Sequence, residues 1–268
     1  MLTILLLLIN ICATGLGIYI FDNKVDSMID SPLVIILSIL AGTILMLVIS
    51  ILYVEGFYYF VAKRKPLDSK IKHFIAKQAM ALPLHATNTR VKVVGRENLP
   101  KNQGFSIYSN HTSMMDIPVL MCGLKDHPIA FLAKQVVADL PVIGKWTVPL
   151  GCIMIDRDND RKAAESIIKV IKNVKNGSSM VIFPEGTRTY TIGELIEFKP
   201  GSFKVAMKSK APLVPITIVK AKNFRNIKWP LPKKVTIVIH KPLLFEEFRG
   251  MNSLELSDKV KTIIEASL

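Results

Sequence analysis

Hydrophobic and polar positions divide the chain into an apolar front and an alternating remainder. Residues 2–21 and 32–54 contain no charged side chain. Each run reaches the ~20 residues that a helix needs to cross the ~30 Å hydrocarbon core of a bilayer. A cleaved secretory signal is the alternative for the first run, but that run lacks a basic start and a clear small-residue cleavage site. The pattern therefore favours a two-helix transmembrane hairpin over residues 1–62.

The charges around these two apolar runs predict their orientation. The connection, residues 22–31, holds three aspartates and one lysine, whereas Lys63, Arg64 and Lys65 lie in the segment after the second run. Basic residues stay on the cytoplasmic side of a membrane. We therefore expect an integral membrane protein whose N-terminus and large domain lie on the cytoplasmic side of the cell membrane.

Residues 63–90 predict an amphipathic connecting helix. Between Asp68 and Leu82, apolar side chains recur at helical spacing, and lysines occupy other parts of the helix. Such a helix can lie in the membrane interface with its lysines on the lipid phosphates. It can equally pack its stripe onto a domain core. The stripe consists of Ile71, Phe74, Ile75, Gln78 and Leu82.

From residue 91 onward the pattern alternates between strands and helices. Short continuous apolar runs are typical of strands that are buried on both faces of a parallel sheet. Helical spacing over residues 161–175, 203–208 and 253–266 supplies covering helices, with Gly177 ending the first and Ser253 as the N-cap of the last. Residues 91–268 therefore predict an α/β domain with a single mixed, largely parallel sheet flanked by helices. The predicted strands are Val91–Val94, Phe105–Ser109, Ile129–Leu132, Cys152–Ile155, Met180–Phe183, Leu213–Val219 and Val235–His240.

Charge also separates the two parts of the chain. Residues 1–62 carry a net charge of −3, so residues 63–268 contribute +17 to the chain's +14. A domain this basic suits nucleic acid, anionic lipid or acidic soluble ligands. The sequence contains no paired Cys/His finger, RNP-like strand or arginine-rich arm, which argues against nucleic acid, and the apolar front favours anionic phospholipids. The three cysteines and five histidines show no metal-ligand spacing, so we expect no metal site.

Candidate chemistry begins where the strand over residues 105–109 ends. His111 follows that strand, and Asp116 comes five residues later. A carboxylate there can accept a hydrogen bond from one imidazole nitrogen, which leaves the other nitrogen as a base. No Gly-x-Ser-x-Gly nucleophile motif accompanies the pair, so the simplest mechanism is direct attack of a substrate hydroxyl on an acyl carbonyl. Helix capping and chance are the alternative explanations of such a pair.

Two other strand ends deliver arginines to loops. In Phe183–Arg188 the proline stops strand pairing, the glycine permits close backbone approach, and the arginine offers a forked donor to phosphate. Gly151–Arg157 has the same form. Arg157 and Arg188 therefore predict a shared anion pocket, which Lys134 can join from a third strand end. An ordinary turn with solvated charges is the alternative.

Four blocks in this order resemble those of the glycerolipid acyltransferase family, in which 1-acylglycerol-3-phosphate acyltransferases are the common small members. The resemblance covers roughly residues 91–240, and the combination of blocks is more specific than any one of them. The blocks are Asn110–Asp116, Gly151–Arg157, Phe183–Arg188 and Leu213–Ile216.

The resemblance implies roles for individual residues. His111 would act as the base and Asp116 as its partner. No metal and no bound cofactor are implied, only an acyl thioester on coenzyme A or acyl-carrier protein as co-substrate. The implied ligands of the acceptor's phosphate and glycerol are Arg157, Glu185, Gly186, Thr187, Arg188 and Lys134.

Three functions are compatible with the sequence. The first is acyl transfer to the sn-2 hydroxyl of 1-acyl-sn-glycerol-3-phosphate (lysophosphatidic acid), which gives phosphatidic acid. The second is a sibling acyltransferase that acts on glycerol-3-phosphate, another lysophospholipid or a lipid-linked amine. The third is a catalytically silent, membrane-anchored protein that binds anionic lipid. Intact His111 and Asp116 favour an enzyme, and the hairpin with one compact domain favours the first function.

Overall fold

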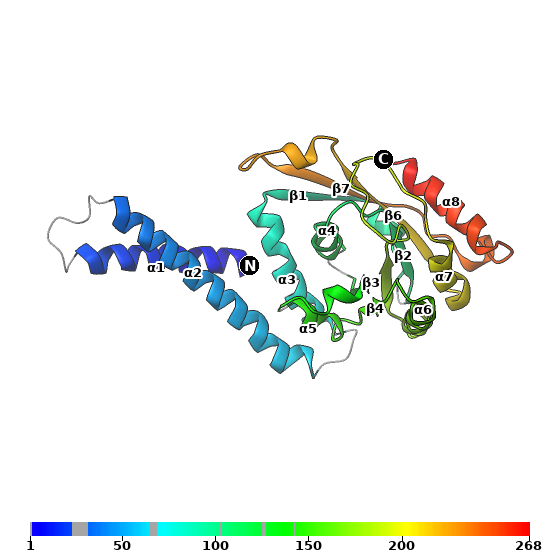
Figure 1. Ribbon diagram of the computed structural model, residues 1–268, viewed down its shortest axis with the longest axis horizontal. Helices are drawn as coiled ribbons and strands as arrows, with labels where there is room; N and C mark the ends of the chain where they lie inside the picture. The colour runs from blue at the N-terminus through cyan, green and yellow to red at the C-terminus, as the bar shows by residue number, and fades with distance from the viewer. Residues whose placement is uncertain (1, 23–31, 65–68, 102, 125–126, 142) are drawn as a thin grey trace. The chain divides into compact units, whose positions relative to one another are not determined.

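The computed structural model describes residues 2–22, 32–64, 69–101, 103–124, 127–141 and 143–268 (Figure 1). The chain divides into two compact units, Met1–Arg64 and Lys65–Leu268. The first contains helices α1 (Leu2–Asp22) and α2 (Pro32–Phe57), and a short π-helical turn (Tyr58–Ala62) follows α2. Most of the acidic connection and Lys65, on which the predicted orientation rests, lie outside the described residues.

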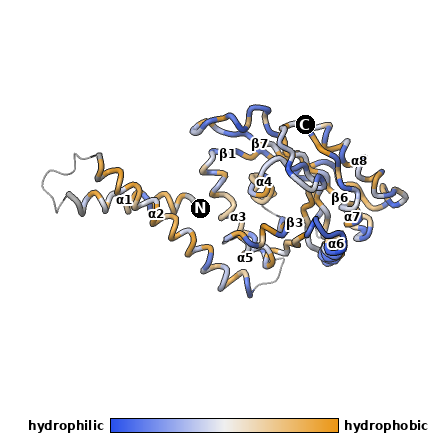
Figure 2. Tube along the Cα trace, in the orientation of Figure 1, coloured by the Kyte–Doolittle hydropathy of each residue, from blue (hydrophilic) through white to orange (hydrophobic). Residues whose placement is uncertain are grey.

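Small side chains line the contact between α1 and α2. A Cβ atom on Gly42 would lie 2.8 Å from Oγ1 of Thr14, and one on Gly17 would lie 3.2 Å from Oγ of Ser38. Small residues at such positions let two helix backbones approach closely, as they do in helix pairs within lipid. Many of the larger apolar side chains of both helices are exposed, and Figure 2 shows both helices as largely hydrophobic.

One stretch of the first unit meets the requirements of a membrane span. Among the described residues, Ile35–Ala62 is long and apolar enough to cross a bilayer, by length and composition, and Leu6–Tyr19 forms a shorter apolar helix. This stretch is compatible with membrane association by its length and composition. Two crossings with a defined orientation stay a prediction.

A seven-stranded sheet forms the centre of the second unit and confirms the predicted mixed, largely parallel architecture. Its order is β1-β7-β6-β2-β5-β3-β4, and β6 pairs antiparallel with β7. Each strand lies within two residues of its predicted bounds at either end. The strands are β1 (Thr89–Val94), β2 (Ser106–Ser109), β3 (Ile129–Lys134), β4 (Ile153–Ile155), β5 (Ser179–Ile182), β6 (Leu213–Lys220) and β7 (Lys233–Ile239).

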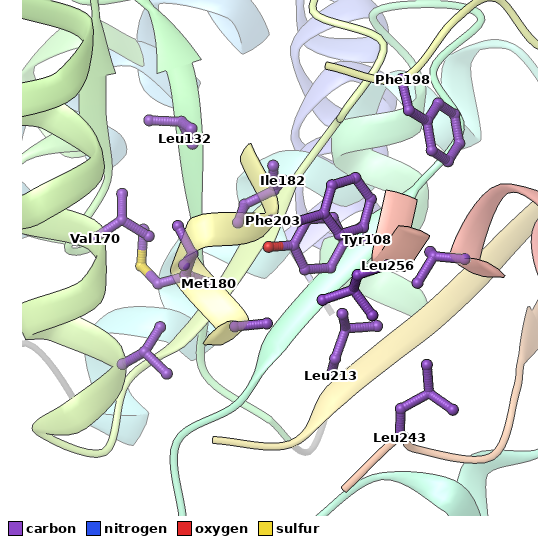
Figure 3. Close-up of a cluster of buried hydrophobic side chains, with 14 of the residues drawn as sticks. Tyr108, Leu132, Val170, Met180, Ile182, Phe198, Phe203, Leu213, Leu243 and Leu256 are labelled. Atoms are coloured by element: carbon purple, nitrogen blue, oxygen red, sulfur yellow. The ribbon is translucent and has the colours of Figure 1, made fainter. Parts of the chain in front are cut away.

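Helices cover both faces of this sheet. Helices α3 (Lys70–Ala86) and α4 (Asp116–Gly123) lie on one side, and α6 (Asp160–Lys175), α7 (Lys204–Ser209) and α8 (Ser253–Glu265) lie on the other (Figure 1). A short helix, α5 (Ile143–Thr147), precedes β4. The successive β2 residues Ile107 and Tyr108 point to opposite faces and are both fully buried. In the core on the α6–α8 side, the Tyr108 ring stacks on Phe203 with 4.4 Å between centroids, and its hydroxyl donates to the carbonyl of Ser202 at 2.9 Å (Figure 3).

The helices depart from the sequence predictions at two places. In α3 the predicted stripe is divided, because Ile75 is buried whereas Ile71 and Phe74 are exposed. Part of the stripe therefore packs onto the domain and part remains on its surface. The predicted N-cap of α8 was wrong by one residue. Asn252 is the N-cap, since its side chain accepts from the N–H groups at positions 254 and 255, and Ser253 is the first helical residue.

Candidate active site

His111 and Asp116 meet at the carboxyl edge of the central strands. Nδ1 of His111 lies 2.9 Å from Oδ2 of Asp116, which is the first residue of α4. The side chain of His111 is 15% exposed and that of Asp116 is fully buried. Nε2 of His111 has no hydrogen-bond partner within the part of the chain that the structure describes. This nitrogen is therefore placed to meet a substrate hydroxyl.

Backbone donors from the intervening loop complete one side of the Asp116 carboxylate. The N–H groups of Thr112 and Ser113 donate to Oδ2 at 2.8 and 2.9 Å. Burial alone would raise the pKa of Asp116, but the hydrogen bond from His111 and the charge of Lys220 outweigh it and lower that pKa below its ordinary value. Asp116 is thus held as a carboxylate that orients the imidazole of His111.

Lys220 is a site residue that the sequence reasoning missed. Its ammonium group forms an ion pair with Oδ1 of Asp116 and donates to Oγ1 of Thr112 at 2.7 Å and to Oγ of Ser113 at 3.0 Å. Burial lowers the pKa of Lys220, and the nearby Asp116 partly restores it. The sequence feature that could have identified Lys220 is that it is the one charged residue of β6 and ends a mostly apolar run. A charge at the end of a buried strand requires a partner.

The loop after β5 holds His111 by its backbone. The His111 N–H donates to Oε1 of Glu185 at 2.7 Å, and the N–H of Thr189 donates to the His111 carbonyl at 2.8 Å. The hydroxyl of Thr189 bonds the second oxygen of Glu185. The Phe183 ring stacks on the imidazole with 4.1 Å between centroids. Glu185 is buried, which raises its pKa, and its three protein donors only partly offset this.

Asn110 fixes the other end of the His111 loop. Its Nδ2 donates to the carbonyl of Ile218 at 3.0 Å, and its Oδ1 accepts from the N–H of the same residue at 2.7 Å. The amide of Asn110 thus continues the pairing of β2 with β6 beyond the end of β2. His111 therefore leaves the sheet from a rigid point.

A cavity of ≈ 590 Å³ is lined by residues of α6, of β5 and of the loop after β5, and its described lining does not include His111 or Asp116. Phe183, which stacks on His111, forms part of its wall. The rest of the wall combines an apolar surface from α6 and neighbouring strands with several cations. Such a cavity suits a molecule that has both an apolar chain and an anionic group. The apolar surface includes Leu132, Ile155, Ile167, Ile168, Ile171 and Ile182, and the cations are Arg157, Lys199, Lys204 and Lys208.

Among the predicted ligands, Arg157 and Gly186 line this cavity. Burial lowers the pKa of the half-buried Arg157 guanidinium, as expected for a cation that is partly withdrawn from water. Thr187, Arg188 and Lys134 are exposed at neighbouring strand ends, outside the described lining of the cavity. A single anion pocket shared by Arg157 and Arg188 stays a prediction. Over the described residues, no cluster of three or more His, Cys, Asp or Glu side chains could hold a metal ion.

Comparison with known proteins identifies the family of this chain. A model of the family described as Acyltransferase matches residues 90–219. The chain is 31% identical over 177 residues to the 1-acyl-sn-glycerol-3-phosphate acyltransferase of Borreliella burgdorferi, a match to 65% of this chain and 70% of that protein. The corresponding enzyme of Bacillus subtilis is 32% identical over 165 residues, which cover 62% of this chain and 79% of that protein. The protein is therefore an acyltransferase, and it belongs to the glycerolipid acyltransferase family.

A solved structure supports the same fold. The crystal structure of the 1-acyl-sn-glycerophosphate acyltransferase from Thermotoga maritima matches with a TM-score of 0.64 at 22% sequence identity. The match covers 100% of this chain and 96% of that one.

Proposed function

We propose that this protein transfers an acyl chain from an acyl thioester to the sn-2 hydroxyl of 1-acyl-sn-glycerol-3-phosphate and so makes phosphatidic acid. The observation that carries the proposal is the pairing of His111 with Asp116, together with a cavity whose wall includes the Phe183 ring that stacks on His111, an apolar surface and four cations. The names of the relatives from Borreliella burgdorferi and Bacillus subtilis support this acceptor. The donor is acyl-coenzyme A or acyl-carrier protein, and the proposed reaction requires no metal and no bound cofactor.

His111 acts as the general base in the proposed mechanism. Nε2 accepts the proton of the sn-2 hydroxyl as its oxygen attacks the thioester carbonyl. The tetrahedral intermediate then collapses, the carbon–sulfur bond breaks, and the leaving sulfur takes the proton back from Nε2. Asp116, held as a carboxylate, stabilises the imidazolium during this cycle and keeps its ring in one orientation.

The cavity supplies the binding energy and the orientation of the acceptor. Arg157 would pair with the phosphate, and its position as a half-buried cation on the wall of this cavity supports that role. Arg188, Thr187 and Lys134 are exposed and would bind the same headgroup as it enters. Gly186 provides close backbone approach to the glycerol. Glu185 braces the His111 loop and so positions the base.

The first unit anchors the enzyme to its substrate's membrane. We propose that residues 1–62 form a transmembrane hairpin, that residues 63–90 connect it to the catalytic domain over residues 91–268, and that this domain faces the cytoplasm. The basic character of the domain would concentrate anionic phospholipids near the site, an effect that salt weakens.

Acyl transfer by the purified full-length protein in detergent tests the proposal. Acyl-coenzyme A and acyl-carrier protein would each be offered with 1-acylglycerol-3-phosphate, glycerol-3-phosphate and neutral lysolipids, and His111→Ala would serve as the blank. Phosphatidic acid formed by the wild type alone is the expected result. Transfer to a different acceptor would overturn the proposed headgroup, and equal rates from wild type and His111→Ala would overturn the base assignment.

A further inference from the structure

The connection between β6 and β7 together with the first two residues of β7, residues 221–234, is a basic surface with exposed apolar side chains at its turn. Trp229 is 74% exposed and Leu231 is 62% exposed. Residues 221–234 include no acidic residue and five basic ones, three in the connection and two at the start of β7, and most of the segment appears hydrophilic in Figure 2. The basic residues are Lys222, Arg225, Lys228, Lys233 and Lys234.

Specific hydrogen bonds hold this turn in place. The N–H of Leu231 donates to the carbonyl of Lys228 at 3.0 Å and closes the turn. Nδ2 of Asn88 donates to the carbonyl of Pro230 at 2.7 Å, and the carbonyl of Asn88 accepts from the N–H of Lys233 at 3.0 Å. The exposure of Trp229 is therefore a property of a fixed turn, which can contact a partner with little loss of conformational entropy.

The connection lies at the same edge of the sheet as the catalytic dyad. It leaves the carboxyl end of β6, which runs parallel to β2, and His111 follows β2. Nη2 of Arg225 donates to the carbonyl of Thr112 at 3.2 Å, one residue after His111. The Arg225 guanidinium also lies 5.7 Å from the ring centroid of Tyr190, which is 72% exposed.

We propose that residues 221–234 form a second membrane contact that places the active site on an anionic lipid surface. Trp229 would lie at the headgroup level with Leu231 beside it, and the basic residues would lie on lipid phosphates. Isolated exposed apolar side chains are ordinary on soluble proteins, but here they share one 14-residue segment, 221–234, with five cations and no acid. The inference deepens the proposed function, because an acceptor that resides in a bilayer must reach His111 from that surface.

Tryptophan fluorescence of the full-length chain tests the contact directly. The chain contains two tryptophans, and Trp146 is only 6% exposed, so Trp146→Phe leaves Trp229 as the single emitter. In vesicles that contain phosphatidylglycerol and shallow brominated lipids, we expect bromine to quench Trp229 and aqueous iodide to lose access to it. Higher salt should reverse part of this change. If Trp146→Phe fails to fold, the difference in emission between wild type and Trp229→Phe gives the same signal.

Unchanged access of iodide to Trp229 in these vesicles, with no quenching by bromine, would overturn the contact. Protection of Trp229 by acyl-carrier protein in place of lipid would also overturn it and would make the surface a donor-docking site. Because fluorescence requires no turnover, it tests this contact even if the proposed reaction fails.

Activity provides a second and separate readout. In the double variant Trp229→Ser/Leu231→Ser, the apparent KM for acceptor in anionic vesicles should rise about fivefold, the equivalent of one lost interfacial contact. With a monomeric short-chain acceptor, the double variant and the wild type should turn over alike. Leu254→Ser on α8, where Leu254 is 57% exposed, is the matched control. It should change neither the apparent KM in vesicles nor the turnover of the monomeric acceptor. An unchanged KM in vesicles for the double variant would contradict the proposal.

Discussion

The main-chain N–H of His111 donates a hydrogen bond of 2.7 Å to Oε1 of Glu185, which lies 74 residues further along the chain. The N–H of Thr189 returns a hydrogen bond to the His111 carbonyl. The loop after β5 therefore holds His111 by its backbone on both sides, while Asp116 holds its ring. The segments around His111 and Glu185 are far apart in sequence but form one structural unit. A substitution in the loop after β5 should therefore affect His111.

Replacing Thr189 with valine should lower both stability and turnover. The hydroxyl of Thr189 donates to the buried carboxylate of Glu185, so its loss leaves one oxygen poorly satisfied at a cost of about 1–3 kcal/mol. A looser Glu185 also loosens His111, so kcat should fall more than KM rises. Denaturant unfolding and steady-state kinetics measure the two effects. Thr262→Val, on the exposed surface of α8, is the control and should change neither.

The stability defect of Thr189→Val should depend on pH. Burial already raises the pKa of Glu185, and loss of the Thr189 donor raises it further. A carboxyl whose pKa is higher in the folded than in the unfolded state loses stability as pH rises through the folded value. The deficit should therefore be smaller in mildly acidic buffer than near neutrality. A deficit that grows toward acid would contradict this account of Glu185.

Replacing Lys220 with methionine should destabilise the fold and shift the pH dependence of activity. Removing one partner of a buried ion pair typically costs about 3–5 kcal/mol. Without the charge of Lys220, burial acts on Asp116 with less opposition, so the pKa of Asp116 rises. Asp116 then takes up a proton at higher pH, and the acid limb of kcat/KM should move upward. Where the methionine variant does not fold, Lys220→Gln offers a neutral donor for the same measurement.

Lys241→Met, at an exposed site after β7, is the control for the loss of one lysine. Its acid limb should coincide with that of the wild type. An unshifted acid limb in a folded Lys220 variant would mean that His111 and the backbone donors alone keep Asp116 ionised.

Replacing Arg157 with glutamine should weaken binding of the phosphorylated acceptor. A charge-assisted hydrogen bond to phosphate contributes roughly 1.5–3 kcal/mol, so KM for the acceptor should rise by about one to two orders of magnitude, with little change for the acyl donor. Stability should change little, because burial already disfavours the charged guanidinium. Arg161→Gln on α6, where the side chain is 92% exposed, is the matched control. A rise in the donor's KM would assign Arg157 to the thioester.

Replacing Gly186 with alanine should affect activity more than a comparable change at Gly193. Both glycines have positive φ angles, +72° and +89°, so an added Cβ strains either backbone by about 1–2 kcal/mol. At Gly186 the Cβ would also lie 2.7 Å from Cε of Lys199, which lines the cavity, whereas at Gly193 it would meet nothing within 4 Å. Similar melting temperatures with lower activity only for Gly186→Ala are the expected result. Equal activities of the two variants would show that the reaction does not depend on the part of the cavity wall that Gly186 and Lys199 form.

Local pattern accounts for most of what could be predicted from the sequence. The central strands β2, β5 and β6 are mostly apolar runs because they are buried on both faces, whereas β1 and β7 alternate between buried and more exposed residues. The start of α8 shows that local pattern does not fix the end of a helix to the residue. Asn252 and Ser253 are both residue types that favour the N-cap position, and Asn252 occupies it. The stripe of α3 shows another limit, since spacing does not reveal which apolar residues a neighbouring element will cover.

The sequence by itself determined the apolar front, the alternation of strands and helices, and the residues of the dyad, because periodicity and turn chemistry act over a few neighbouring positions. The tertiary structure decided which distant residues join them. Lys220 reaches Asp116 across 104 residues because β6 lies beside β2, and Arg157 lines the cavity while Arg188 remains exposed. Strand order sets these contacts, and it results from the packing of all the elements together, which no short stretch of sequence contains.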